Sequence, residues 1–248
     1  MKLNIERRGK GRPLVFFHGW GFDHRVWLPL ATALETQYSL YLVDLPGFGL
    51  SSPMSWSDFK DRLLQQLPKQ FVIIGWSMGG LFATKLAIEA SEHIMHLINV
   101  ASSPRFIKNE NWPGIEKRVF STFFKNLATN PQQTISEFIH LQLRTSRLHC
   151  SKYQKNNYHP IEFQPQPEHL KTGLEILATW DLRHALHDFH KPASYLFGRL
   201  DAITPVATMD TMQQLYPAFN YVMLAKAAHM PFLSHQHEFI KCLEQLLA

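Results

Sequence analysis

The stretch FVIIGWSMGGLFATKLAIEA at residues 71–90 decides the fold that we expect for this chain. Its first part, FVIIGW, is apolar and strand-sized, and the part from Met78 onward has the periodicity of a helix. The junction GWSMG at residues 75–79 fits the pattern G-x-S-x-G. Between a strand and a helix, this pattern predicts a sharp turn that lifts the hydroxyl of Ser77 out of the sheet, because the flanking glycines leave room for the crowded backbone.

Apolar runs and helical segments alternate on both sides of this junction. Ser55, with Asp58 three residues later, is the expected N-terminal cap of one helix. The alternation predicts an α/β protein with a mostly parallel twisted sheet and helices on both faces. We expect further strands at residues 14–17, 38–43, 96–100, 194–197 and 221–224, and further helices at residues 26–34, 55–67, 205–215 and 238–247.

The alternation stops between residues 112 and 179, where the chain becomes helical, basic, aromatic and interrupted by prolines. We expect this segment to be a helical lid inserted into one core domain formed by residues 1–111 and 180–248. The apolar side chains of the lid have two open interpretations: they line a channel for an acyl chain, or they pack the lid on the core. These side chains are Phe123, Phe124, Phe138, Leu141 and Leu143.

The formal net charge is +5, and residues 115–158 hold the whole excess. Such a basic segment attracts oppositely charged molecules, so an acidic protein or an anionic substrate is the expected partner. We do not expect nucleic-acid binding, because the aromatic and basic motifs of nucleic-acid-binding folds are absent from the sequence. The segment's basic residues are Lys117, Arg118, Lys125, Arg144, Arg147, Lys152 and Lys155, and its acidic residues are Glu116 and Glu137.

Several classes of protein are disfavoured by features that the sequence lacks. No run approaches the roughly 18 apolar residues of a membrane span. The first residues lack the apolar segment of a secretion signal, so we expect a cytoplasmic protein, and we expect a monomer. Cys150 and Cys242 lie far apart, and no HExxH or similar ligand pattern occurs. We therefore expect no disulfide framework, no metal and no cofactor.

A serine hydroxyl is a weak nucleophile at neutral pH, so Ser77 needs a base and a group that orients the base. After this kind of turn, the acid and the histidine follow later strands in the order Ser, Asp, His. Asp201 lies just after the strand expected at 194–197, and His229 follows the last expected strand. The alternatives fit less well: Asp181 and Asp188 precede that strand, Asp210 lies within a helix, and His235 and His237 lie near the start of the last helix.

The negative oxygen of a tetrahedral intermediate needs two N–H donors. We expect one from the backbone of Met78, the residue after the nucleophile, and the other from the backbone of Trp20 in the loop HGWG at 18–21. The indole of Trp20 has two open interpretations, as a wall of an acyl pocket or as a core side chain. Together these residues predict a serine hydrolase that transfers an acyl group to water.

Beyond these general features, the sequence resembles the pimeloyl-[acyl-carrier protein] methyl ester esterases of biotin synthesis, which have the α/β-hydrolase fold. The likeness covers almost the whole chain. VASSP, WPGI and GLEIL are its most specific parts, because neither the turn at Ser77 nor the triad requires them. The matching stretches are HGWG at 18–21, LVDLPGFG at 42–49, GWSMGG at 75–80, VASSP at 100–104, WPGI at 112–115, GLEIL at 173–177 and AKAAHMPF at 225–232.

The resemblance implies hydrolysis of the methyl ester of pimeloyl-acyl carrier protein to free pimeloyl-acyl carrier protein and methanol. Acyl carrier protein is strongly acidic, so the basic segment would have a partner, with Arg144, Arg147, Lys152 and Lys155 as the candidate docking residues. The substrate-contacting positions that the family implies are Trp20, Ser77, Met78, Phe138, Ile139, His140, Leu141, Gln142 and His229.

Other activities remain open at this point. The same triad serves general short-chain carboxylesterases, C–C bond hydrolases and a lyase of the menaquinone pathway on a similar fold. A non-catalytic ligand receptor is a third class, because a fold alone does not fix a function. The intact set of Ser77, Asp201 and His229 argues against a receptor.

Reversing the charge of two basic residues tests the docking role of the basic segment. We expect Arg144→Glu combined with Arg147→Glu to raise KM for a carrier-linked ester, because the acidic carrier loses its attraction to the lid. Steady-state kinetics with a small soluble ester serve as the control and should hardly change. Equal effects on the two substrates would mean that the basic segment is not a docking surface.

Overall fold

Strand β4 (Phe71–Trp76) lies in the middle of the sheet, and all six of its residues are buried. Phe71 and Ile73 belong to one hydrophobic cluster, whereas Val72 and Ile74 belong to a second cluster. Successive side chains of a strand point to opposite faces, so a strand with helices on both faces is apolar throughout. The continuous apolar run in the sequence therefore reflects burial on both sides of the sheet.

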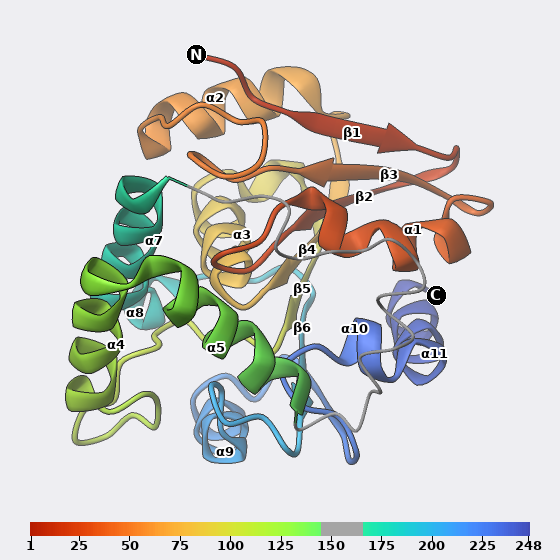
Figure 1. Cartoon of the computed structure of the whole chain (residues 1–248). Helices are drawn as coiled ribbons and strands as arrows, with labels where there is room; N and C mark the ends of the chain where they lie inside the picture. The colour runs from red at the N-terminus through yellow and green to blue at the C-terminus, as the bar shows by residue number, and fades with distance from the viewer. Residues whose placement is uncertain (145–165) are drawn as a thin grey trace.

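The computed structural model of the chain describes residues 1–144 and 166–248. Its sheet has seven strands in the order β1-β3-β2-β4-β5-β6-β7 (Figure 1). Only the pair β1–β3 is antiparallel among the described pairs of strands, which confirms the predicted mostly parallel α/β sheet. The other strands are β1 (Ile5–Arg8), β2 (Arg12–Phe17), β3 (Tyr38–Val43), β5 (Ile94–Val100), β6 (Ala193–Gly198) and β7 (Asn220–Leu224).

Helices cover both faces of the sheet and bury one cluster on each face. One face carries α1 (Leu28–Leu34), α10 (Pro231–Ser234) and α11 (Gln236–Leu247), which lie at the right of Figure 1. The other face carries α2 (Trp56–Gln66), α3 (Met78–Glu89), α8 (Arg183–Leu186) and α9 (Val206–Leu215). Two short 3-10 helices, η1 (His24–Trp27) and η2 (Ser91–His93), precede α1 and β5.

The predicted elements are present, with some shifted ends. Strands β3 and β4 have the predicted bounds, whereas β2 and β5 each begin two residues earlier than expected. The helix expected at 26–34 begins instead as the 3-10 turn η1, and α1 starts only at Leu28. Pro29 fits this start, because the N–H groups of a first helical turn have no partner within the helix. Strand β1 was not predicted, because a short edge strand with exposed charges carries little apolar signal.

Within the described residues of the segment that interrupts the alternation, the helices are α4 (Lys117–Thr129), α5 (Pro131–Arg144) and α7 (Pro167–Thr179). Figure 1 shows them grouped on one side of the molecule. The start of the segment, at residues 112–115, is not helical and forms isolated β-bridges to residues 107–109. The ring of Trp112 is buried. None of the described helices is long and apolar enough to cross a membrane.

The cap of α2 offers a direct test of the local sequence signal. The Oγ atom of Ser55 accepts the backbone N–H of Asp58 at 3.1 Å and donates to its carboxylate at 2.7 Å. We expect Ser55→Ala to lower the free energy of unfolding by about 1 kcal/mol, because an N–H of the first turn loses its acceptor. Urea denaturation measures this, with Ser57→Ala, an exposed serine of the same helix, as the control. Equal midpoints for the two variants would contradict a stabilising cap.

Candidate active site

Three side chains from separate loops meet at the carboxyl ends of parallel strands. Ser77 follows β4, Asp201 follows β6 and His229 follows β7. His229 Nε2 lies 2.9 Å from Ser77 Oγ, and His229 Nδ1 lies 2.8 Å from Asp201 Oδ2. All three residues are buried. The structure thus brings together the serine, histidine and aspartate singled out in the sequence, at hydrogen-bonding distance.

The loop after β6 determines the orientation of the Asp201 carboxylate. Its Oδ1 atom accepts the backbone N–H groups of Ile203 at 2.7 Å and Thr204 at 3.0 Å. Its Oδ2 atom therefore faces His229, and because a carboxylate only accepts, Nδ1 of the imidazole must carry the proton. Nε2 then has a free lone pair directed at Ser77, which is the arrangement needed to accept the proton of the serine.

The turn at Ser77 has the backbone strain expected of this junction. Ser77 has φ 54° and ψ −121°, a conformation that a residue with a side chain rarely adopts. A Cβ atom on Gly79 would lie 2.4 Å from the carbonyl oxygen of Phe17, so α3 approaches β2 more closely than a side chain would allow. The glycine of the motif is therefore required by close backbone packing.

The loop at residues 18–21 carries the second expected N–H donor and is held by His18. His18 Nε2 accepts the backbone N–H of Leu45 at 3.0 Å, and Nδ1 donates to the carbonyl oxygen of Gly19 at 2.8 Å. Burial of the imidazole lowers the pKa of His18, so the ring is neutral. Trp20 follows directly in this loop, and Met78 is the first residue of α3, where the N–H has no partner within the helix.

The indole of Trp20 packs between this loop and the helices α4, α5 and α7. Its Nε1–H donates to the carbonyl oxygen of Leu170 at 2.8 Å, and the ring is buried. Its ring lies edge-on to Phe123 and Phe138, at centroid distances of 5.4 Å and 5.3 Å. A Cβ atom on Gly173 would lie 2.7 Å from the indole, so α7 rests directly on it. This supports the core interpretation of the indole, and its role as a wall of an acyl pocket stays a prediction.

The substrate residues implied on α5 fall into different surroundings. Phe138 packs on Trp20, whereas Ile139 joins the buried cluster that contains Trp76. Gln142 is buried, and its side-chain amide donates to the carbonyl oxygen of Phe138 at 3.3 Å. The side chains of His140, Leu141 and Leu143 lie outside the described part of the chain, so their expected contacts stay predictions.

Most of the candidate docking residues also lie outside the described part. Arg144 is the last residue of α5, and nothing is described of its side chain. Arg147, Lys152 and Lys155 fall between residues 145 and 165. The three basic residues of α4, which are Lys117, Arg118 and Lys125, are exposed.

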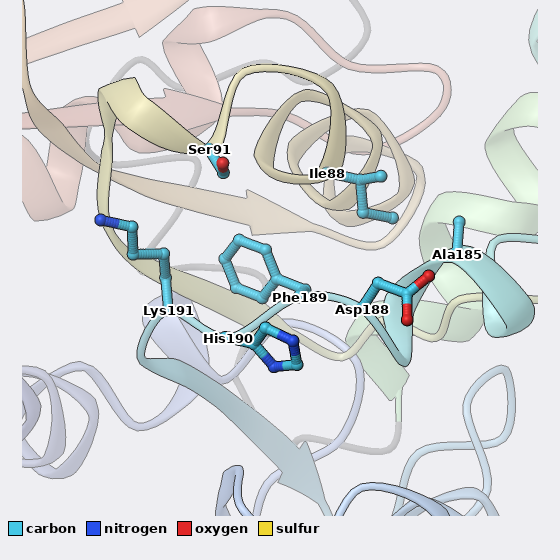
Figure 2. A pocket seen from close by; sticks show the side chains of 7 residues that line it. All are labelled: Ile88, Ser91, Ala185, Asp188, Phe189, His190 and Lys191. Carbon is cyan, nitrogen blue, oxygen red and sulfur yellow. The ribbon is translucent and has the colours of Figure 1, made fainter.

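One cavity lined by described residues, drawn in Figure 2, does not include any residue of the triad. It has a volume of about 500 Å³, and its lining includes Ser91, Phe189 and Lys191. Ser91 precedes β5 and Lys191 precedes β6, so this cavity lies at the amino ends of the strands, opposite the triad. A smaller cavity of about 100 Å³, lined by Met78 and by apolar side chains that include Phe48 and Trp180, lies closer to the nucleophile.

A second polar cluster beside the loop at 18–21 was not predicted from the sequence. His24 Nδ1 lies 2.7 Å from Asp44 Oδ1, and its Nε2 lies 3.1 Å from Glu6 Oε2. Asp44 also accepts the backbone N–H of His24 at 2.7 Å, the amide of Asn4 at 2.8 Å and the backbone N–H of Leu50 at 2.9 Å. The only sequence signal was the aspartate at the end of an apolar strand in LVDLPGFG.

The ligand atoms of Asp23, His24 and Asp44 lie within 4.8 Å of one another, which is close enough to consider a metal ion. The hydrogen bonds account for them better, because Asp23 holds Arg25 through both carboxylate oxygens and both ring nitrogens of His24 face carboxylates. Burial works against protonation of His24, but the hydrogen bond and charge of Asp44, with the charges of Asp23 and Glu6, outweigh burial and raise its pKa. The cluster is therefore an ion-pair network.

The chain is similar to known proteins over its whole length. The model of the alpha/beta hydrolase fold family matches residues 12–236. The pimeloyl-[acyl-carrier protein] methyl ester esterase of Legionella pneumophila (strain Paris) is 48% identical over 247 residues, which cover 100% of each chain. The protein of the same name from Aeromonas salmonicida (strain A449) is 38% identical and covers 97% of each chain.

Solved structures agree with the fold. An esterase from Exiguobacterium antarcticum superposes with a TM-score of 0.89 at 19% identity, covering 99% of this chain and 96% of the esterase. A bromoperoxidase from Bacillus anthracis superposes with a TM-score of 0.86 at 23% identity, covering 99% and 95%. At such low identity these likenesses concern the fold alone.

The ion pairs of His24 should make stability depend on pH. The folded state raises the pKa of His24, so its stabilisation is fully present below the unfolded pKa of about 6.5 and is lost as pH rises through the folded pKa. We expect His24→Gln to cost roughly 2 kcal/mol of unfolding free energy at about pH 5.5 and clearly less at about pH 8.5. Chemical denaturation at both pH values measures the difference.

A second variant separates the ion pairs from the packing of the ring. Glu6→Gln removes one of the two carboxylates that face the imidazole, so it should reduce the part of the stabilisation that varies with pH. A cost of His24→Gln that is the same at both pH values would show that the imidazole acts through packing alone.

Proposed function

This chain belongs to the α/β-hydrolase fold family and, within it, to the pimeloyl-[acyl-carrier protein] methyl ester esterases, and on this basis we propose its reaction. It is a serine carboxylesterase that hydrolyses the methyl ester of pimeloyl-acyl carrier protein to free pimeloyl-acyl carrier protein and methanol in biotin synthesis. The observation that carries this proposal is the full-length identity of 48% to an esterase of that name, together with the hydrogen-bonded Ser77, His229 and Asp201.

The first half of the reaction transfers the acyl group to the enzyme. Ser77 Oγ attacks the ester carbonyl, and His229 Nε2 takes the proton of the hydroxyl. Asp201 stabilises the imidazolium that forms, and its two backbone N–H contacts keep the carboxylate in place. His229 then returns the proton to the departing methoxy group, so methanol leaves and an acyl–serine ester remains.

The second half repeats these steps with water. His229 takes a proton from water, the hydroxide attacks the acyl–serine ester, and the proton returns to Ser77 as the free carboxylic acid leaves. The acid then loses its own proton to solvent and becomes the carboxylate. The backbone N–H groups of Met78 and Trp20 donate to the negative oxygen in both tetrahedral intermediates. Each such donor typically contributes roughly 3 kcal/mol of transition-state stabilisation.

The acyl carrier protein that holds the pimeloyl chain is the proposed partner. The basic excess within residues 115–158 supports this, because an acidic carrier is attracted to a positive surface. We place the docking surface on the lid at 112–179, with Arg144, Arg147, Lys152 and Lys155 as its candidate residues. The apolar lining of the small cavity beside Met78 is consistent with an acyl substrate. We further propose that the enzyme works in the cytoplasm as a monomer, without metal or cofactor.

The direct test is mass spectrometry of pimeloyl-carrier-protein methyl ester after incubation with the purified protein. We expect a mass decrease that corresponds to loss of the methyl group, together with release of methanol. Ser77→Ala should reduce the rate by roughly 10⁴-fold or more, because the nucleophile is removed. Ser91→Ala is the matched control and should keep the normal rate, because Ser91 lies at the amino ends of the strands, away from the triad.

The outcomes distinguish the substrate from the chemistry. Demethylation that depends on Ser77 supports both. Cleavage of small esters without demethylation would leave a serine hydrolase with a different substrate. Normal turnover by Ser77→Ala would remove the serine mechanism altogether.

A further inference from the structure

The carbonyl oxygen of Ser77 accepts a hydrogen bond from a buried side chain in the turn after the neighbouring strand. Ser102 Oγ donates to the carbonyl oxygen of Ser77 at 2.7 Å, and the backbone N–H of Gly80 donates to the same oxygen at 2.9 Å. Ser102 is 1% exposed. It comes from the VASSP stretch directly after β5, and it has no part in the proposed mechanism.

This contact matters because of the peptide group to which the carbonyl belongs. The C=O of Ser77 and the N–H of Met78 are parts of one planar peptide unit, and in a trans peptide they point in opposite directions. A donor that holds the C=O from below the turn therefore fixes the direction of the N–H above it. That N–H is the proposed donor to the negative oxygen of the intermediate.

The position of Ser102 is itself determined by the turn that carries it. Ala101 has φ 45°, a strained value for a residue with a side chain. Its N–H donates to the carbonyl oxygen of Leu196 at 2.8 Å, and its carbonyl oxygen accepts the hydroxyl of Thr204 at 3.1 Å. These bonds connect the turn to β6 and to the loop that holds the carboxylate, so the backbone just before Ser102 is anchored to two other parts of the site.

The Ser102 hydroxyl fits beside the turn because Gly80, the last glycine of GWSMGG, has no side chain. A Cβ atom on Gly80 would lie 2.2 Å from Ser102 Oγ and 2.4 Å from Ser102 Cβ, and rotation of the hydroxyl would not relieve the second contact. Gly80 and Ser102 are thus complementary. Because Gly80 lacks a Cβ atom, the Ser102 hydroxyl can reach the carbonyl oxygen of Ser77.

We propose that Ser102 is a positioning residue that aims the N–H of Met78 at the negative oxygen of the tetrahedral intermediate. The hydrogen bond also polarises the peptide group, which makes the N–H a stronger donor. The other proposed donor has a matching arrangement, because His18 holds the carbonyl oxygen of Gly19, the partner of the N–H of Trp20 in its peptide unit. This inference rests on the proposed serine chemistry and does not depend on the carrier-linked substrate.

The test compares Ser102→Ala with Ser103→Ala. Ser103 is the neighbouring buried serine, and its hydroxyl donates instead to the carbonyl oxygen of Arg105 at 2.6 Å. With p-nitrophenyl butyrate, we expect Ser102→Ala to lower kcat by about ten- to a hundredfold with KM changed by less than about twofold, because a donor in the transition state is misaligned. Ser103→Ala should keep both parameters near the wild-type values.

Two further measurements separate alignment from a general loss of structure. A fluorophosphonate labels Ser77 covalently, and its labelling to completion counts the folded protein, while its labelling rate should fall in Ser102→Ala by a factor similar to that in kcat. A trifluoromethyl ketone adds to the serine and places a negative oxygen at the same donors, so its affinity should fall as well. The Tm of each variant shows whether stability has changed.

The outcomes decide the proposal in each case. Equal kcat values for the two alanine variants would overturn it, as would a fall in kcat no larger than the loss of labelled protein. If Ser102→Ala does not fold, Ser102→Cys retains a weak donor of similar size, and an intermediate labelling rate would support the proposal whereas a wild-type rate would overturn it. Wild-type protein that cleaves the small ester but not the carrier methyl ester would contradict the proposed substrate alone. Wild-type protein that the probe fails to label would overturn both.

Discussion

The close approach of α3 to β2 and β4 at Ser77 is the constraint on which the rest of the site depends. The backbone turns from strand to helix within one residue, and that residue has a positive φ. Such a conformation persists only where the surroundings determine it. Here the N–H of Ser77 donates to the carbonyl oxygen of Val100 at 3.0 Å, and its carbonyl oxygen accepts two donors. The turn is therefore held by the end of β5 and by the residues that follow it. This rigid turn places the Ser77 hydroxyl within hydrogen-bonding distance of His229.

The triad is a short chain of hydrogen bonds inside a buried region. An ionised carboxylate is costly to bury unless its oxygens are paired. Asp201 satisfies this condition, because Oδ1 accepts two backbone N–H groups and Oδ2 accepts the imidazole. The backbone oxygen of His229 in turn accepts the indole N–H of Trp76 at 2.8 Å. Each member of the chain is thus held by a backbone contact as well as by its neighbour.

The loop that carries Trp20 is fastened at both ends to the end of β3. His18 accepts the N–H of Leu45, and His24 binds the carboxylate of Asp44. The two histidines have pKa values shifted in opposite directions, because burial dominates for His18 and the surrounding carboxylates dominate for His24. The same loop is therefore held by the neutral imidazole of His18 and by the imidazole of His24, whose protonated form is stabilised by the carboxylates. The position of the Trp20 backbone follows from both.

The sequence by itself determined the α/β fold and most of its strands and helices, because burial on two faces leaves long apolar runs and the turn at Ser77 requires its glycines. It also singled out Ser77, Asp201 and His229, since each lies in a loop just after a strand. It did not reveal Ser102, His24 or Asp44 as parts of the site's support, because a hydrogen bond between residues 20 or 25 positions apart leaves no periodic signal. Only the tertiary structure decided which polar side chains meet, since that depends on the order of strands in the sheet and on the strained turns that bring loops together.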